Sequence, residues 1–228
     1  MEWHQYFEDT WIAEDNGVRF FLLIGTKKAL LIDSGMMVHN ARDLAKEKTD
    51  LPLELLNTHA DMDHVGSNAQ FEAFYMHPSE EENYRRGGRE GRLIPINEGD
   101  RLDLGERVLE IIHLPGHTPG SIAVVDTKHR VLISGDPIQE NGRIFMFGPQ
   151  RNMRDYIVSL GALEKHFDAF DEIWPSHGKL PVGKETVALL RKGAQDVLDG
   201  KVQGEATEMH GHSIVAYDVG VSVLLCDA

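Results

Sequence analysis

One short segment constrains this chain more than any other, because it concentrates side chains that bind metals. Residues 58–66 read THADMDHVG and carry two histidines and two aspartates within six positions, at His59, Asp61, Asp63 and His64. Neutral imidazole and carboxylate oxygen are ligands of zinc, iron and related metals. The segment directly follows an expected strand, and a tight loop there can direct alternate side chains into one cavity. The segment therefore predicts a metal site.

Three further potential ligands lie in turns rich in glycine and proline, and each turn follows an expected strand. They are His117 in LPGHTPGS, Asp136 in SGD and His177 in PSHG. Glycine lets the backbone approach closely, and proline stiffens the loop that holds a ligand. These residues are therefore predicted to join the same site.

The rest of the chain predicts short strands with helices in each half. Apolar β-rich runs predict a hairpin of strands at 17–25 and 29–33, and further strands at 53–57, 73–76, 102–104, 107–114, 121–126, 131–134, 172–174 and 213–225. Helices are expected at 38–48, 79–86, 153–166 and 184–198. Two sheets packed face to face, with helices outside, would account for this order. With no linker or repeat in view, we expect a single domain over residues 1–228.

The composition is that of an ordinary globular protein with an acidic surface. The chain has 228 residues, of which 41% are hydrophobic and 26% charged, and its formal net charge is −14. Such a surface repels nucleic-acid phosphates and anionic membranes, so we expect neither as a partner. The N-terminal residues lack the basic and apolar regions of a signal peptide, which predicts a cytoplasmic location. Cys226 lies in an apolar run and is expected to be a small buried side chain rather than a reactive thiol.

The order and approximate spacing of the four ligand segments resemble those of the metallo-β-lactamase-fold hydrolases. Asp33, in LLIDSG, matches a structural aspartate of that family, and the resemblance covers roughly residues 17–183. It implies an α/β (α+β) fold, a four-layer αββα sandwich with the site at one edge between the sheets. It also implies the ligand sets: His59, Asp61 and His117 for a first metal, Asp63, His64 and His177 for a second, and Asp136 as the bridge between them.

One ligand position departs from the usual family motif, His-x-His-x-Asp-His. Asp61 stands where the second histidine is expected. A carboxylate there is compatible with two metals, because the flavodiiron branch carries glutamate at that place. We expect two divalent metal ions, with zinc first and iron or manganese as alternatives. The third carboxylate lowers the net charge of the site, and our hypothesis is that it shifts preference toward the harder metals.

The resemblance implies a hydrolase that uses a hydroxide held by the metals. Asp63 would orient this nucleophile, and His212 and Tyr217 are candidates for substrate contact. The expected substrate is a small ester, thioester, lactone or phosphodiester. The spacing of the later ligands resembles the glyoxalase II branch, which cleaves thioesters. The other histidines fit no ligand pattern and are interpreted as ordinary surface or core residues: His4, His39, His77, His113, His129, His166 and His210.

Two other classes of function remain open from the sequence. A di-iron oxidoreductase of the flavodiiron-like branch would use the carboxylate at Asp61, although Gly66 stands where that branch has an acid. A binding module that holds metal without turnover is the third alternative. The expected partner is a small-molecule substrate, and the oligomeric state stays open, with a homodimer as one option.

Overall fold

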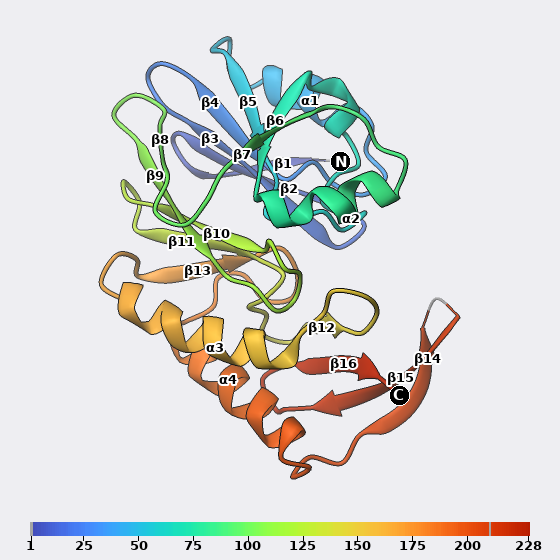
Figure 1. Ribbon diagram of the computed structural model, residues 1–228. Helices are drawn as coiled ribbons and strands as arrows, with labels where there is room; N and C mark the ends of the chain where they lie inside the picture. The colour runs from blue at the N-terminus through green and yellow to red at the C-terminus, as the bar shows by residue number, and fades with distance from the viewer. Residues whose placement is uncertain (1, 210) are drawn as a thin grey trace. The chain divides into compact units, whose positions relative to one another are not determined.

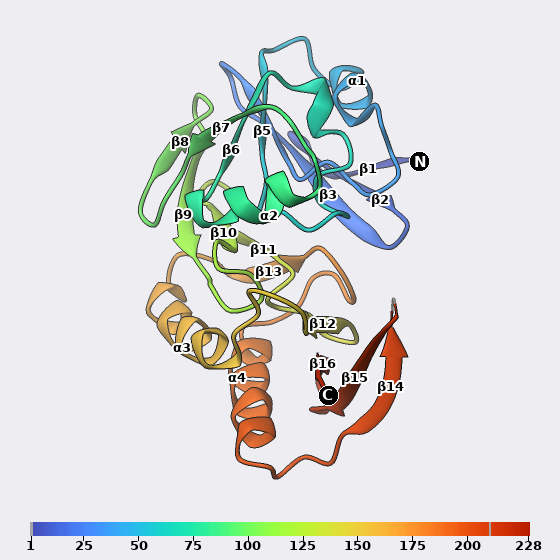
Figure 2. The same ribbon diagram turned by 45° about the vertical axis from the view of Figure 1, so that its right-hand side comes forward.

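The computed structural model describes residues 2–209 and 211–228, which fall into two compact units. The first unit comprises Met1–Ile112 and Val124–His129, and the second comprises His113–Ala123 and Arg130–Ala228. Figures 1 and 2 show the course of the chain. Among the described residues, no helix has both the length and the apolar character needed to cross a bilayer.

The first unit is built on a seven-stranded sheet whose strands follow chain order from β1 to β7. These strands are β1 (Trp3–Phe7), β2 (Thr10–Asp15), β3 (Val18–Ile24), β4 (Ala29–Ile32), β5 (Leu53–Leu56), β6 (Ala73–Met76) and β7 (Arg92–Pro95). The first four strands are antiparallel, and β4 to β7 are parallel. Because the carboxyl ends of parallel strands meet at one edge, the residues after β4 and β5 become neighbours. Ile32 pairs with Leu56, and the Asp33 amide donates to the Leu56 carbonyl at 2.8 Å.

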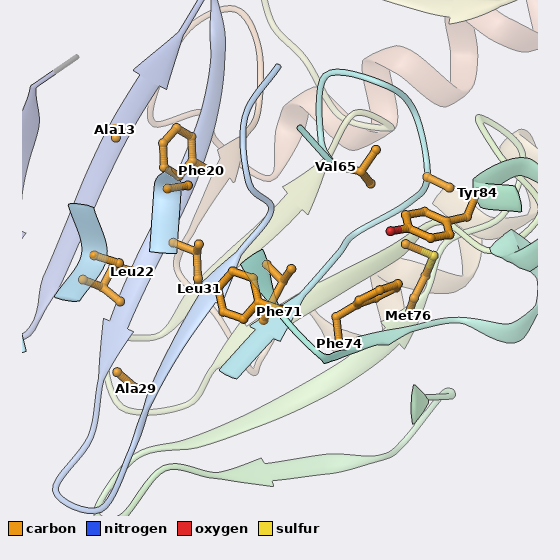
Figure 3. Packing of buried hydrophobic residues seen from close by; sticks show 14 residues of the cluster. Ala13, Phe20, Leu22, Ala29, Leu31, Val65, Phe71, Phe74, Met76 and Tyr84 are labelled. Atoms are coloured by element: carbon orange, nitrogen blue, oxygen red, sulfur yellow. The ribbon is translucent and has the colours of Figure 1, made fainter. Parts of the chain in front are cut away.

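Short helices and a hairpin complete the first unit. The helices are α1 (Ala41–Lys46), α2 (Glu81–Arg86) and the 3₁₀ helices η1 (Asn68–Gln70) and η2 (Pro78–Glu80). β8 (Arg101–Asp103) and β9 (Val108–His113) pair antiparallel. A core cluster that includes Phe20, Leu31 and Phe74 lies among the sheet and the loops after its strands (Figure 3). Burial of these side chains stabilises the scaffold that carries those loops.

The second unit carries the longer helices and a smaller sheet. β10 (Ile122–Asp126) begins in this unit and ends in the first. β11 (Val131–Gly135) pairs in parallel with β13 (Glu172–Pro175). A four-stranded sheet has the order β12 (Arg143–Met146), β16 (Val223–Asp227), β15 (His212–Asp218) and β14 (Glu205–Met209). α3 (Met153–Leu163) continues into η3 (Glu164–His166) and lies beside α4 (Glu185–Leu198), as both views show.

Most expected elements are present, and two expectations were wrong in detail. The single strand expected at 213–225 is two antiparallel strands, because Asp218 Oδ1 accepts the Gly220 amide and closes a turn. The helix expected at 38–48 begins only at Ala41, because Asp15 and Ser67 bind the backbone of Val38 outside a helix. Strands β1, β2, β7, β12 and β14 were not expected.

Candidate metal centre

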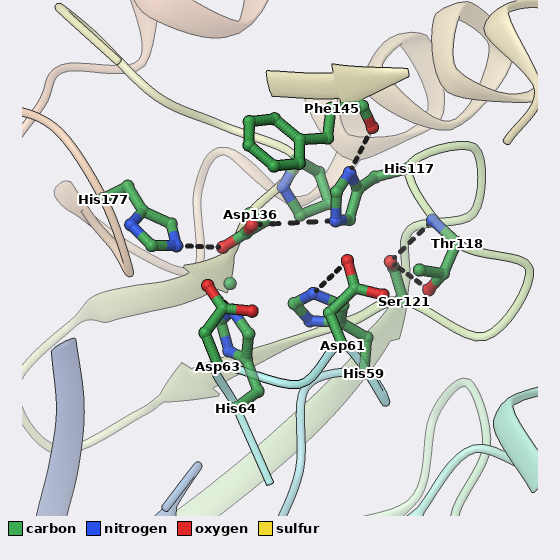
Figure 4. A network of polar contacts seen from close by, with 12 residues as sticks. His59, Asp61, Asp63, His64, His117, Thr118, Ser121, Asp136, Phe145 and His177 are labelled. Carbon is green, nitrogen blue, oxygen red and sulfur yellow. Dashed lines mark hydrogen bonds and ion pairs between the residues drawn. The ribbon is translucent and has the colours of Figure 1, made fainter. Parts of the chain in front are cut away.

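The candidate ligands of the first unit lie in the loop that follows β5. His59 and His64 are fully buried, whereas Asp61 and Asp63 are partly exposed. His59 Nε2 lies 3.5 Å from Asp61 Oδ2, and His64 Nε2 lies 3.6 Å from Asp63 Oδ2. The four side chains predicted from residues 58–66 therefore form two histidine–aspartate pairs (Figure 4).

Asp33 determines which nitrogen of His64 is available to a metal. Its Oδ2 lies 2.8 Å from His64 Nδ1, and a carboxylate can only accept, so Nδ1 carries the proton. The Thr58 hydroxyl donates to the same oxygen at 2.8 Å and lies 3.0 Å from His59 Nδ1. Since that hydroxyl proton is already engaged, His59 Nδ1 is the donor in this second contact. Both imidazoles therefore present the lone pair of Nε2, the arrangement found in carboxylate–histidine–metal sites.

The second unit carries its own candidate ligands in three loops. Asp136 and His177 follow β11 and β13, whose parallel pairing brings their carboxyl ends together. The two oxygens of Asp136 face two different histidines. Oδ1 lies 3.3 Å from His177 Nε2, and Oδ2 lies 3.6 Å from His117 Nε2 (Figure 4). One carboxylate that faces two imidazoles through separate oxygens is suited to bridging two metals.

A tight turn holds His117 in a defined tautomer. Thr118 and Ser121 bond across the turn, with 2.7 Å between their hydroxyl oxygens. Gly116 has φ +130, and a Cβ there would come within 2.3 Å of the Tyr156 backbone, so a larger residue would push the turn away from α3. His117 Nδ1 donates to the Phe145 carbonyl at 2.9 Å, which leaves the lone pair on Nε2.

These four pairs fit a divalent cation better than they fit direct bonds. Their nitrogen–oxygen distances are 3.3–3.6 Å, whereas hydrogen bonds span about 2.7–3.2 Å. In three of the pairs the Nε2 lone pair faces a carboxylate oxygen, which is repulsive unless a cation lies between them. Two ligands at about 2.0–2.1 Å from one tetrahedral zinc lie about 3.3 Å apart. The donor set of each unit therefore fits metal coordination.

Two supporting residues gave no signal in the sequence. Glu80 is buried, and its Oε2 accepts the Ala60 amide at 2.9 Å, which fixes the backbone beside His59. Asn83, on α2, donates to Asp61 Oδ1 at 3.3 Å. This contact leaves Oδ2 directed at His59. Asn83 lies 22 positions from Asp61, so only the structure reveals this contact.

The two candidate substrate contacts lie on β15 in the second unit. His212 is exposed and its ring lies 5.9 Å from the ring of Phe147, whereas Tyr217 is half-buried. Five positions separate them, so they point to opposite faces of the strand. Their contact with substrate stays a prediction. His210 lies outside the described residues.

Two of the histidines without an expected role in the site make local contacts, and Cys226 has a raised thiol pKa. His129 Nε2 bonds Asp9 at 2.7 Å, and the His77 ring accepts the Ser79 amide at the start of η2. Burial, together with the charge of Asp227, raises the pKa of the Cys226 thiol to about 11. This thiol is protonated at neutral pH, which agrees with the expectation of an unreactive side chain.

A mixed α+β fold that carries histidine–aspartate ligand sets at strand ends is typical of a metal-dependent hydrolase. Residues 15–174 match the family described as the Metallo-beta-lactamase superfamily, and that match covers well over half of the chain. The protein belongs to this superfamily. The resemblance expected from the sequence is thereby confirmed, and so is the class of enzyme, a metallo-hydrolase.

Named relatives and solved structures agree with this assignment. An acyl-coenzyme A thioesterase, MBLAC2 of Gallus gallus, is 27% identical over 212 residues, which is 75% of this chain and 76% of the relative. A hydroxyacylglutathione hydrolase of Nostoc punctiforme is 30% identical over 170 residues, covering 69% of this chain and 63% of the relative. A metallo-beta-lactamase from Pontibacter korlensis has a TM-score of 0.71 at 16% identity, covering 86% of this chain and 99% of that one. This structural likeness confirms the predicted fold class.

An Asp33→Asn variant should bind added zinc about 10- to 100-fold more weakly, the usual effect of losing a partner that orients a ligand. The amide nitrogen would face His64 Nδ1–H, so the imidazole would have to turn or move its proton to Nε2. Competition against a chromophoric chelator measures the affinity, with Asp43→Asn on α1 as the control. Equal zinc affinity in both variants, with both folded by circular dichroism, would contradict the role given to Asp33.

Proposed function

We propose that this protein is a thioester hydrolase whose two ligand sets assemble around two divalent metal ions, with zinc first and iron or manganese as alternatives. The observation that carries the proposal is the set of four histidine–carboxylate pairs at 3.3–3.6 Å, three of them with a defined Nε2 lone pair. The proposed ligand sets are those implied by the sequence: His59, Asp61 and His117; Asp63, His64 and His177; and Asp136 for both ions.

The chain's own residues have distinct roles in the proposed reaction. When bound, the ions would supply Lewis-acid activation of the thioester carbonyl and lower the pKa of water. Asp63 Oδ2 is directed at His64, so its other oxygen is the one that would accept a proton from the attacking water. Asn83 would keep Asp61 bound through a single oxygen. A new carbon–oxygen bond forms, the carbon–sulfur bond breaks, and the products are a carboxylic acid and a thiol.

The choice of thioesters over other substrates rests on the relatives and on leaving-group chemistry. One of the relatives described above is named an acyl-coenzyme A thioesterase, and the other a hydroxyacylglutathione hydrolase, so both names describe hydrolysis of an acyl conjugate of a thiol. A thiol has a pKa near 8.5, so it departs as thiolate near neutral pH without a strong general acid. A single carboxylate base such as Asp63 is therefore sufficient for the proton transfers.

A substrate panel with metal removal tests this proposal. Purified protein should hydrolyse small acyl thioesters with a higher kcat/KM than the matched oxygen esters, lactones and phosphodiesters. Removal of metal by a chelator should abolish hydrolysis, and added zinc should restore it. Elemental analysis should find close to two equivalents of metal in the active protein. Faster cleavage of phosphodiesters, or activity that survives complete metal removal, would overturn the proposal.

The remaining proposals concern the setting of the enzyme. We propose a single metallo-β-lactamase-like domain over residues 1–228 that acts in the cytoplasm on a small molecule, without nucleic-acid or membrane partners. The net charge of −14 supports the exclusion of polyanionic partners. Sedimentation analysis would decide between a monomer and a homodimer.

A further inference from the structure

A cavity of about 620 Å³ lies in the first unit beside the metal-binding loop. Its lining comes from the segment after β4, from the loop and η1, and from α2 with the residues that follow it. Met62, one of the lining residues, stands between the ligands Asp61 and Asp63. The volume falls within the range of about 300–1,000 Å³ that is usual for small-molecule pockets.

Apolar side chains form one wall of this cavity, and polar or charged side chains form the rest of the lining: His39, Asn68, Glu72, Arg89 and Glu90. Met36, Met62, Val65 and Phe71 all contribute, and Figure 3 shows Val65 and Phe71 together with the lining residue Tyr84. The Met62 side chain is 62% exposed, so it is accessible to a ligand in the cavity. Methionine adapts its shape to irregular apolar ligands because its side chain is unbranched and polarisable.

The cavity wall that carries Met36 is fixed to the metal-binding loop. Asp15 Oδ2 accepts the amides of Met36, Met37 and Val38 at 2.9, 2.6 and 2.8 Å. The Gly66 amide donates to the Gly35 carbonyl at 2.8 Å. A Cβ on Gly66 would lie 2.6 Å from the carbonyl oxygens of Gly35 and Met36, so only glycine permits this approach. These contacts therefore fix the position of the cavity wall at Met36 relative to the candidate ligands in the loop.

We propose that this cavity binds the apolar acyl group of the substrate, so that chain length determines specificity. The proposal rests on the proposed thioester hydrolase function and specifies its substrate class. An acyl chain suits the apolar wall of the cavity because it is apolar and flexible, as the side chains of Met36 and Met62 are. Each methylene that becomes buried should strengthen binding up to about fourfold, until the cavity is filled.

Two measurements on the whole protein test this assignment. The first is the dissociation constant, by calorimetry, of S-alkyl-N-acetylcysteamine thioethers with 2 to 12 carbons, which resist hydrolysis. The second is kcat/KM for the matching acyl thioesters. Ala69 lines the cavity and is exposed, so the Ala69→Trp variant should fold and fill part of the space. Val158→Trp, at a position on α3 that is 70% exposed and away from the lining, is the matched control.

In wild-type protein and Val158→Trp, affinity and kcat/KM should rise with chain length and then level off. In Ala69→Trp, the ratio of long-chain to short-chain values should fall at least tenfold for both measurements. A flat wild-type series, or the same slope in Ala69→Trp, would overturn the proposed acyl site. Binding that depends on chain length without any hydrolysis would support this site and overturn only the proposed function. Thioester hydrolysis that does not depend on chain length would support the proposed function and overturn the acyl site.

Discussion

An Asp136→Ala variant should lose about three orders of magnitude in kcat/KM. Metal ions supply several kcal/mol of transition-state stabilisation, and each tenfold change in rate corresponds to about 1.4 kcal/mol. The two carboxylate oxygens of Asp136 face His117 and His177 at 3.6 and 3.3 Å. Removal of the carboxylate takes a ligand from both proposed ions at once. Metal content should therefore fall from about two equivalents to one or fewer.

Elemental analysis and thioester hydrolysis, measured on the same preparation, check this expectation. Asp168→Ala is the control, since Asp168 is an exposed aspartate of the second unit. The control should retain wild-type metal content and activity. Two equivalents of metal together with wild-type activity in Asp136→Ala would show that Asp136 does not bridge a metal pair.

The largest effect on stability is expected from Arg107→Ala, at about 3–5 kcal/mol in the free energy of unfolding. The Arg107 side chain is fully buried, and it donates to Asp126 Oδ2 at 2.5 Å and to Thr10 Oγ1 at 2.7 Å. It also donates to the Asp9 carbonyl at 2.8 Å. Asp126 is only 2% exposed, so loss of the guanidinium would leave its carboxylate buried without the charge that compensates it.

Denaturant unfolding measures this effect, with Arg101→Ala as the control. Arg101 pairs with Glu110 at 2.6 Å, but its side chain is 64% exposed, so its loss should cost less than about 1 kcal/mol. The double variant Arg107→Met with Asp126→Leu should recover much of the loss, because no charge is then left buried. The stability losses of the single variants Arg107→Met and Asp126→Leu can be added and compared with the loss in the double variant. If the two values are equal, the unpaired Asp126 carboxylate does not explain the instability caused by removing Arg107.

The same network lowers the pKa of Asp9. Burial alone would raise this pKa, but the hydrogen bond from Lys128, the charge of Arg107 and the contact with His129 together lower it to about 2. An aspartate whose pKa is depressed on folding stabilises the folded state above its unfolded pKa near 3.8. That contribution is lost as the pH falls from about 4 toward 2. Through the Asp9 carboxylate, Arg107 therefore contributes stability that is full above about pH 4 and is lost in acid.

The sequence predicted the fold where apolar residues were dense and failed where strands were polar or followed a polar turn. β3, β4 and β6 are apolar runs, and they lie where they were expected. β14 is exposed at four of its five positions, and β12 begins with the exposed Arg143 after the polar run QENG, so neither shows a readable period. These strands depend on the backbone hydrogen bonds of their neighbours, which side-chain patterning does not encode.

The candidate site could be predicted as far as ligand identity, because histidine and aspartate bind metal through their own side chains. The residues that orient these ligands were harder to find. The contribution of Phe145 is a backbone carbonyl, so the identity of its side chain carries no signal. Asn83 contacts Asp61 across 22 positions, and only the packing of α2 against the loop reveals that contact. Asp33 was expected as a structural aspartate, and the structure adds its bonds to Thr58 and His64.

The parallel pairing of β12 with β16 has a practical consequence for anyone who prepares this protein. Phe145, whose carbonyl holds His117, lies opposite Leu225, and Asp227 Oδ1 accepts the Gly148 amide at 3.0 Å. A single residue, Ala228, therefore separates any affinity tag or fluorescent fusion joined after it from β16, a strand that supports a candidate metal ligand. β1, at the edge of the seven-stranded sheet, makes the N-terminal end the safer point of attachment. Metal content should be compared between the two fusion arrangements before any kinetic constant is interpreted.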